Sequence, residues 1–373
     1  MFSRSSRHAR SSSPPSYQMM PHGVWTVFAS FHHPLALGAA PAATTLLAGN
    51  TVVLKSAEET SWSARIFAEM VRDAGIPTGV FTLISGAPKD MGDSMFHDVR
   101  VAGTTFTGAR SAGRPLAQMM WTSHPSRPCV AEFTSKAARI VTATADIDAT
   151  AASSARDAFG LTGQRPGAPS YLVVHHDVAD ALTSRLASLA SALHIGDPTF
   201  PETQVGPLVS PDDHAHYRQV THQLHEQGAR VLFGGETLNA HGLGAGHFVA
   251  PTLAYVPTDE HPCWGRELLL PVLLMRRFRT PDRAVLTIRD LKRTSTVRVY
   301  GNDEDAAWFT QALANVAERP DWLAPEGATS AWTSMPASLR AEETAAPDAA
   351  DALSALHAYL AQYLRAGSAP VTP

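Results

Sequence analysis

Cysteine, basic charge and long apolar runs are all scarce in this chain, and each scarcity excludes a class of protein. Only two cysteines, Cys129 and Cys263, occur among 373 residues. Two cannot form a disulfide framework, so we expect a reducing, cytoplasmic location. The formal net charge is −4, and without a basic surplus neither nucleic acid nor an anionic membrane is an expected partner.

No apolar stretch is long enough to span a bilayer. The most apolar one, Leu35–Gly49, falls short of the roughly 20 residues that a spanning helix needs, and it predicts a buried helix instead. Residues 1–20 are basic, rich in serine and without an apolar core, so they are not a secretory signal. Their composition faintly resembles an organelle transit peptide, but a disordered tail is the better interpretation.

From Gly23 onward the sequence alternates between short β-branched or aliphatic segments and longer amphipathic ones. We expect strands at 24–29, 51–54, 81–85 and 101–106, and helices at 35–48, 61–74 and from about 109 to Met120. Strands separated by helices of this length predict an α/β fold with a parallel, doubly wound sheet.

A second α/β unit is predicted from about Ala137. Its expected strands are 139–142 and 171–174, and its expected helices are 147–159, 179–193 and 212–227. Beyond Arg293 the periodicity weakens, although 301–316 still fits a strand end with a helix and 352–366 fits a last amphipathic helix.

Lys55 and Glu58 form the most specific chemical motif of the chain. Lys55 ends a predicted buried strand and Glu58 follows it three residues later, so both belong at the carboxyl edge of a parallel sheet, where such sheets bind ligands. An ammonium and a carboxylate there can hydrogen-bond the two hydroxyls of an adenosine ribose. A solvated ion pair at a strand end explains these two residues equally well.

The segment from Phe106 to Gly113 follows a strand and opens a helix. Gly108 lets the backbone approach a diphosphate, and the helix N-terminus supplies N–H donors and the positive end of a dipole. A Gly-x-x-x-x-Gly turn is a weak signal alone, because many such turns are only helix caps.

Glu132, expected on a loop after a strand, and Pro166, after a Gly-Gln turn, have the layout of a general base and a nucleophile. Nucleophilic catalysis needs a thiol, hydroxyl or amine at the second position. Proline has none of these and also lacks a backbone N–H. Cys129 lies on the strand face opposite to Glu132, so we expect a small buried hydrophobe there rather than a relocated nucleophile.

Seventeen histidines raise the question of a metal site. His222 and His225 lie one helical turn apart, and His214 and His216 lie just before them, but the sequence has no His-Glu-x-x-His pattern and no Cys/His cluster. Either pattern would have supported a structural or catalytic zinc. We therefore expect surface histidines and no metal.

With these motifs in this order, the chain resembles the aldehyde dehydrogenase superfamily, and most closely the branch that oxidises glutamate γ-semialdehyde, the open form of 1-pyrroline-5-carboxylate. The likeness covers roughly Pro21 to Phe278. It rests on Gly23-Val24-Trp25, Pro34-Leu35-Ala36, 48–58, 74–80, Phe106-Thr107-Gly108, Gly163-Gln164, Gly196-Asp197-Pro198 and Gly206-Pro207. The resemblance implies an aldehyde dehydrogenase-like α/β fold, with an incomplete Rossmann-type cofactor domain followed by an α/β catalytic domain.

The resemblance also implies NAD or NADP as cofactor and assigns its contacts. Lys55 and Glu58 would hold the adenosine ribose. Gly108 and Gly113 would line the diphosphate turn. Glu267, in the segment Arg266-Glu267-Leu268, matches the glutamate that holds the nicotinamide ribose.

The catalytic positions depart from the family pattern. Glu132 matches the general base that activates water, but Pro166 stands where the family has its nucleophilic cysteine. Pro169 stands where this branch has a second cysteine, and His32 stands where an asparagine stabilises the oxyanion, although imidazole can also donate a hydrogen bond. The other departures around the reaction centre are Ala109, Thr134, Ser135, Leu269 and Leu270.

The implied function is the NAD(P)-dependent oxidation of an aldehyde such as glutamate γ-semialdehyde to the carboxylate, with thiol-dependent oxidation absent or vestigial because of Pro166. The alternatives are a non-catalytic paralogue that binds a nucleotide or a partner subunit, and a truncated or frameshifted gene product. Homo- and hetero-oligomers both remain open. We expect a disordered tail over 1–20 and a partial NAD(P)-binding domain over 21–136. A catalytic domain over 137–320 and a divergent C-terminal segment over 321–373 should follow.

Overall fold

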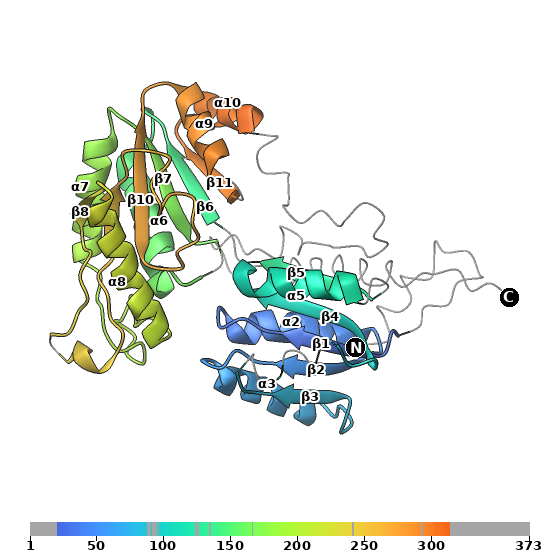
Figure 1. Cartoon of the computed structure of the whole chain (residues 1–373). Helices are drawn as coiled ribbons and strands as arrows, with labels where there is room; N and C mark the ends of the chain where they lie inside the picture. Colours follow the sequence, from blue (N-terminus) through green and yellow to red (C-terminus); the bar gives the residue numbers. More distant parts are fainter. Residues whose placement is uncertain are drawn as a thin grey trace. The chain divides into compact units, whose positions relative to one another are not determined.

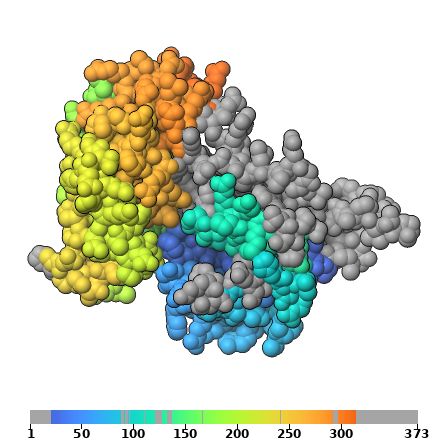
Figure 2. Space-filling view, in the orientation of Figure 1, coloured from blue at the N-terminus to red at the C-terminus, as the bar shows by residue number. Residues whose placement is uncertain are grey.

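The computed structural model describes residues 21–87, 91, 95, 97–123, 127–133, 136–165, 167–240, 242–291 and 294–313. These residues form two compact units, of which the first ends at Phe133 and the second follows it (Figure 1). Figure 2 shows the first unit in blue to teal and the second in green to orange. In the described part of the chain, no helix combines the length and apolarity needed to cross a membrane.

The first unit contains a five-stranded sheet in the order β3-β2-β1-β4-β5, and all its pairings are parallel. Its strands are β1 (Val24–Phe28), β2 (Thr51–Lys55), β3 (Phe81–Ile84), β4 (Val101–Gly108) and β5 (Cys129–Phe133). The chain winds outward from β1 to β3 and then crosses to β4 on the other side of β1. This order is that of a Rossmann-type domain and confirms the predicted doubly wound sheet.

Helices cover both faces of the first sheet, namely α2 (Pro34–Leu47), α3 (Ser61–Asp73) and α5 (Arg110–Ser123). Val27 of β1 packs with Ala42 of α2 in one apolar cluster. The next residue, Phe28, packs with Met120 of α5 in another. Successive strand residues therefore enter opposite cores, which is why these strands are mostly apolar.

The first unit confirms the predicted strands and helices but not the predicted position of Glu132. Each of its predicted strands and helices is present, with ends shifted by no more than three residues. The predicted loop position of Glu132 is wrong, because β5 continues to Phe133 and Glu132 pairs with Thr107 of β4. Pairing with β4 extends this strand beyond the point where its own residues predict a turn.

The second unit contains a six-stranded sheet in the order β11-β6-β7-β10-β9-β8. Only the pairing of β8 with β9 is antiparallel among its described pairings. Its strands are β6 (Lys136–Val141), β7 (Pro169–His175), β8 (Arg230–Phe233), β9 (Thr252–Tyr255), β10 (Val272–Phe278) and β11 (Thr294–Tyr300).

Two large cores lie on the two faces of the second sheet. Its helices are α6 (Ile147–Phe159), α7 (Ala179–Ser191), α8 (Pro211–Glu226), α9 (Pro281–Asp290) and α10 (Asp303–Leu313). Tyr171 and Val173 of β7 pack with side chains of α8, α9 and α10. The alternate residues Leu172 and Val174 pack with α6 and α7. A three-layer α/β architecture follows from this alternation.

Beyond Arg293 the predicted helix within 301–316 is confirmed by α10, whereas the strand β11 was not predicted. β11 pairs in parallel with β6, with Val297 opposite Ala138, and α10 contributes buried Phe309 to the core. These partners lie far away in sequence, so local periodicity signals them weakly. The predicted helix at 352–366 lies outside the described residues.

Candidate functional site

The candidate site of the first unit is the carboxyl edge of its sheet. Phe28, which ends β1, pairs with Lys55, which ends β2, and Gly108 at the end of β4 pairs with Phe133. The strand order reverses between β1 and β4, and loops that leave such a point in opposite directions form the usual ligand crevice of this sheet type. The predicted site residues His32, Lys55 and Gly108 all lie at this edge or just beyond it.

Lys55 is a largely buried residue at this edge. Its relative exposure is 6%, and no carboxylate within the described residues lies close enough to form an ion pair with it. Burial lowers the pKa of Lys55, and Glu59 and Glu58 oppose that shift from a distance. Because burying an unpaired charge is costly, this side chain is placed to receive polar groups of a ligand.

Glu58, Gly108 and Gly113, the other predicted cofactor contacts of the first unit, differ from Lys55 in their surroundings. Glu58 is exposed, beyond the end of β2. Gly108 ends β4, with the Phe106 ring 3.1 Å from the place of a Cβ, so a side chain there would crowd the edge. Gly113 lies inside α5, where its N–H donates to the Ala109 carbonyl at 3.0 Å. Its amide is therefore used by the helix, and only its small size remains available for a diphosphate.

His32 lies in the turn between β1 and α2 and is 3% exposed. The Ser30 Oγ is 2.5 Å from His32 Nδ1 and also accepts the His32 backbone N–H at 3.3 Å. Which of the two atoms donates depends on the imidazole tautomer, because the hydroxyl can both donate and accept. Nε2 is buried and has no hydrogen-bond partner in the described structure.

Burial, with His33 adding to it, lowers the pKa of His32 to about 4. The imidazole is therefore neutral at pH 7. A buried polar atom without a partner is costly, and a polar group of a ligand that arrives at this edge would supply a partner for Nε2. The preceding prediction that imidazole can replace an amide donor at this position stays a prediction.

In the second unit, the turn before Pro166 has a strained backbone. Leu161, Thr162 and Gly163 all have positive φ angles, of 51°, 58° and 68°. Non-glycine residues rarely adopt this region, so neighbouring contacts must hold the turn. Thr162 Oγ1 donates to the Gly206 carbonyl at 2.9 Å, and the Val209 N–H donates to Gln164 Oε1 at 2.8 Å.

This turn also touches the segment that carries Glu267. A Cβ on Gly163 would stand 2.3 Å from the Leu270 carbonyl oxygen, so only glycine fits there. Leu269 has a φ of 54°, a second strained position. Glu267 itself is half-buried. The fold therefore joins the Gly163-Gln164 turn to the segment of Glu267 within one unit.

Asp157, near the end of α6, has a role that was not predicted from the sequence. It forms ion pairs with Arg139 of β6, with Arg156 at 3.3 Å and with Arg165 at 3.3 Å. Burial alone would raise the pKa of Asp157, but the arginines lower it overall. The available signal was Arg139, a single charge within the apolar strand from Ala137 to Val141.

Glu132 and Pro166 belong to different units, Glu132 to β5 and Pro166 to the chain that follows Arg165. Pro166 itself lies outside the described residues. Cys129, which the sequence predicts to be a buried hydrophobe rather than a relocated nucleophile, is fully buried, and burial raises the pKa of its thiol to about 12. This confirms the interpretation of Cys129 as a buried hydrophobe.

The match to a known protein family begins before Pro21 and ends after Phe278, so it is longer than the resemblance seen in the sequence motifs. The model of the aldehyde dehydrogenase family matches residues 4–316. A 1-pyrroline-5-carboxylate dehydrogenase 2 of Halalkalibacterium halodurans is 30% identical over 275 residues, covering 72% of this chain and 52% of the relative. A 1-pyrroline-5-carboxylate dehydrogenase of Geobacillus kaustophilus is 31% identical over 271 residues, covering 71% and 52%. The chain thus spans about half the length of these curated relatives.

Solved structures agree with the fold. An NAD-dependent aldehyde dehydrogenase of Sinorhizobium meliloti aligns with a TM-score of 0.72 and 28% identity, over 79% of this chain and 57% of that one. A Mycobacterium tuberculosis aldehyde dehydrogenase complexed with NAD+ aligns with a TM-score of 0.73 and 25% identity, over 79% and 60%. With the family model, the curated relatives and the fold in agreement, the chain belongs to the aldehyde dehydrogenase family.

Proposed function

We propose that this chain binds NAD or NADP and an aldehyde of the glutamate γ-semialdehyde class, as an NAD(P)-dependent aldehyde dehydrogenase whose oxidation step is impaired at Pro166. The curated relatives support the substrate class by their names. The relative complexed with NAD+ supports the cofactor. In this proposal the chain can bind the cofactor and the aldehyde, but Pro166 cannot form the covalent bond that precedes oxidation.

The buried, unpaired Lys55 carries the cofactor part of the proposal. Its ammonium lies at the carboxyl edge, beside the reversal of strand order, and a ribose hydroxyl there would supply the missing hydrogen-bond acceptor. Glu58 would contact the same ribose, and Glu267 of the second unit would hold the nicotinamide ribose. When bound, the nicotinamide accepts a hydride from the substrate.

The residues of this chain would serve the aldehyde as follows. His32 would donate to the carbonyl oxygen in the tautomer that carries the proton on Nε2, since this nitrogen is buried without a partner among the described residues and burial keeps the ring neutral. Glu132 would take a proton from water. In the family a cysteine thiolate adds to the carbonyl first, and Pro166 has no atom that can form this bond.

An assay of Pro166→Cys against Pro166→Ala tests the proposal. Loss of a nucleophile costs on the order of 10⁶ in rate, so we expect the wild type and Pro166→Ala to form NADH from glutamate γ-semialdehyde at background rates. Pro166→Cys should regain part of the activity, limited by Thr134, Ser135 and Leu269. A wild-type turnover within about tenfold of a cysteine-containing relative would overturn the impaired step.

A second candidate function is a non-catalytic subunit that binds a nucleotide, which Pro166 and Lys55 together favour. The same variants separate the two. If Pro166→Cys and Pro166→Ala are equally inactive while calorimetry shows that both bind NAD, the chain is a binding protein. If neither binds NAD, the assignment of the cofactor site is wrong.

The proposal extends to domain limits, location and assembly. We assign 21–136 to cofactor binding and 137–320 to catalysis, with a divergent segment after 320. A cytoplasmic location fits the two cysteines, Cys129 and Cys263, both of which are buried and free. Exposed apolar side chains on the first unit favour self-association or a partner subunit rather than nucleic acid or membrane.

A further inference from the structure

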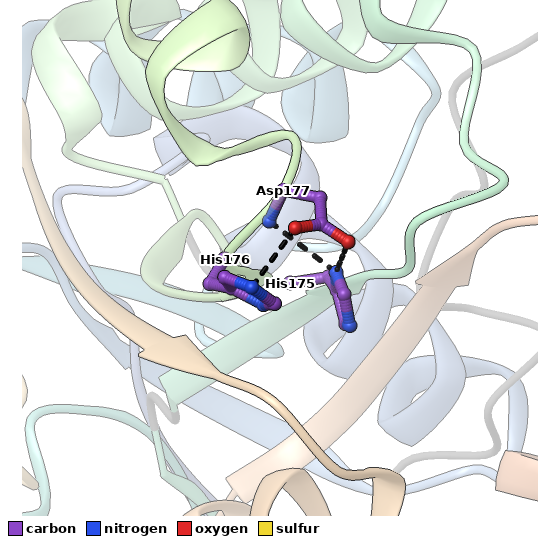
Figure 3. Close-up of side chains that lie close together, drawn as sticks. All are labelled: His175, His176 and Asp177. Carbon is purple, nitrogen blue, oxygen red and sulfur yellow. Dashed lines mark hydrogen bonds and ion pairs between the residues drawn. The ribbon is translucent and has the colours of Figure 1, made fainter.

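We propose that His175, His176 and Asp177 form a binding site for a transition-metal dication of the zinc class. The three residues lie in the turn between β7 and α7 of the second unit (Figure 3). One nitrogen from each histidine and one carboxylate oxygen lie within 4.8 Å of one another. Within the described ranges, this is the one group of three such side chains that could share an ion.

The turn itself brings the ligands together. His175 ends β7, and its ring packs edge-on against Phe278 with the centroids 5.3 Å apart. The His176 backbone N–H donates to the Phe278 carbonyl at 2.9 Å. These contacts with β10 fix both backbones, so the two imidazoles converge on Asp177 although they are adjacent in sequence (Figure 3).

The contacts at His176 Nε2 are incompatible with a single protonation state. Asp177 Oδ1 lies 2.9 Å from this nitrogen, and a carboxylate needs a proton there. Arg279 Nη1 lies 2.7 Å from the same nitrogen, and a guanidinium needs a lone pair there because it only donates. One nitrogen cannot offer both, so one of these contacts is always repulsive in a neutral imidazole.

A dication resolves this conflict. It takes the lone pair of His176 Nε2 and binds the Asp177 carboxylate at the same point. His175 Nδ1 lies 3.5 Å from Asp177 Oδ2 and accepts only a long, 3.4 Å hydrogen bond from the Asp177 N–H. A metal that replaces this weak contact would gain Nδ1 as its third ligand.

Arg279 is the competitor that the metal must displace. Its side chain is exposed, so it can turn into solvent at little cost while the two imidazoles stay in place. As long as it remains, its positive charge lowers the affinity of the site for a cation. Removing Arg279 should therefore strengthen metal binding.

The ligand set selects the metal. Two imidazole nitrogens with one carboxylate suit Zn²⁺, Ni²⁺ and Cu²⁺, whereas Ca²⁺ and Mg²⁺ prefer oxygen ligands. The Asp177 side chain is 61% exposed, so water completes the coordination. His176 Nδ1 is buried and lacks a hydrogen-bond partner among the described residues, and without that support for the ring we expect moderate affinity.

Zinc titration of the full chain by calorimetry, after removal of metal with a chelator, tests the proposal. The double variant His175→Ala/His176→Ala should bind one zinc ion fewer than the wild type, and Asp177→Asn should bind this ion at least about tenfold more weakly. Arg279→Ala should bind it more tightly. The matched control His222→Ala/His225→Ala, on exposed positions of α8, should keep the ion.

A thermal-unfolding series separates binding from folding. Zinc should raise the Tm of the wild type and of the α8 control by several degrees, but not that of the His175/His176 double variant. Asp177→Asn changes an exposed side chain and should retain the metal-free Tm. An equal zinc stoichiometry and affinity in the wild type and the double variant would overturn the proposal, as would tighter binding of Mg²⁺ than of Zn²⁺.

Discussion

Gly163 and Leu270 are in contact through their backbones, with the place of a Gly163 Cβ only 2.3 Å from the Leu270 carbonyl oxygen. This contact attaches the turn before Pro166 to the segment that carries Glu267. We expect Gly163→Ala to destabilise the second unit by about 3 kcal/mol, because the methyl group must displace backbone and the residue keeps a left-handed conformation. Chemical denaturation measures this loss.

Gly167→Ala is the matched control for this prediction. Gly167 has a similar φ of 75° but open space where its Cβ would lie. We expect it to cost about 1 kcal/mol, from conformation alone. Equal losses at both positions would contradict the role assigned to the Leu270 contact.

Asp157→Ala should cost about 3–5 kcal/mol of unfolding free energy, because it leaves the buried Arg139 guanidinium unpaired. Asp180→Ala, which removes an exposed ion pair with Arg277, should cost at most about 1 kcal/mol. The arginines hold the pKa of Asp157 below its usual range. The ionised Asp157 carboxylate therefore stabilises the fold at pH values above its pKa in the unfolded chain. This stabilisation is lost as the pH falls through the pKa of Asp157 in the folded chain.

His32 makes the free energy of unfolding depend on pH between about 4 and 6.5. Its pKa falls from 6.5 to about 4 on folding, so the unfolded chain binds more protons between these values and stability rises with pH there. From pH 7 to pH 5 we expect His32 to account for a loss of about 2 kcal/mol. His32→Asn should remove this part of the pH dependence in urea denaturation, and an unchanged pH profile would show that the imidazole is solvated.

Lys55→Met should weaken binding of both AMP and NAD at least about tenfold, equivalent to about 1.4 kcal/mol, because it removes the ammonium from the adenosine side. Calorimetry with AMP, NAD and NADP is the measurement, and Arg65→Ala, on the exposed face of α3, is the control. Strong NAD binding that survives Lys55→Met but disappears in Glu267→Ala would show that the nicotinamide half dominates.

The outer face of α3 favours self-association. Trp62, Ile66 and Met70 follow one another at helical spacing and are 67%, 42% and 57% exposed, and such apolar stripes commonly mark contact surfaces. We expect association in size-exclusion chromatography with light scattering, and its reduction in Trp62→Lys/Met70→Lys. Leu286→Lys, a comparably exposed site on α9, should leave it unchanged. A monodisperse wild-type monomer would refute this prediction.

Much of the fold could be predicted because the strands and helices of the first unit have strong local signals. Val52 and Leu54 lie in a β-branched strand, and Gly75 with Pro77 follows the end of α3, the next helix along the chain. β8, β9 and β10 were not predicted, since short apolar runs can become strand or buried helix. Their type depends on pairing partners far along the chain, as Leu274 shows by pairing with Tyr171.

The sequence by itself determined the family, the order of the motifs and the absence of a nucleophilic group at Pro166, because each depends on residue identity alone. Only the tertiary structure decided that Lys55 has no ion-pair partner among the described residues, that His32 is buried and neutral, and that Gly163 touches Leu270. It also brought His175, His176 and Asp177 together with Arg279. Burial and contacts between distant segments set protonation and hydrogen bonding, and neither can be obtained from spacing along the chain.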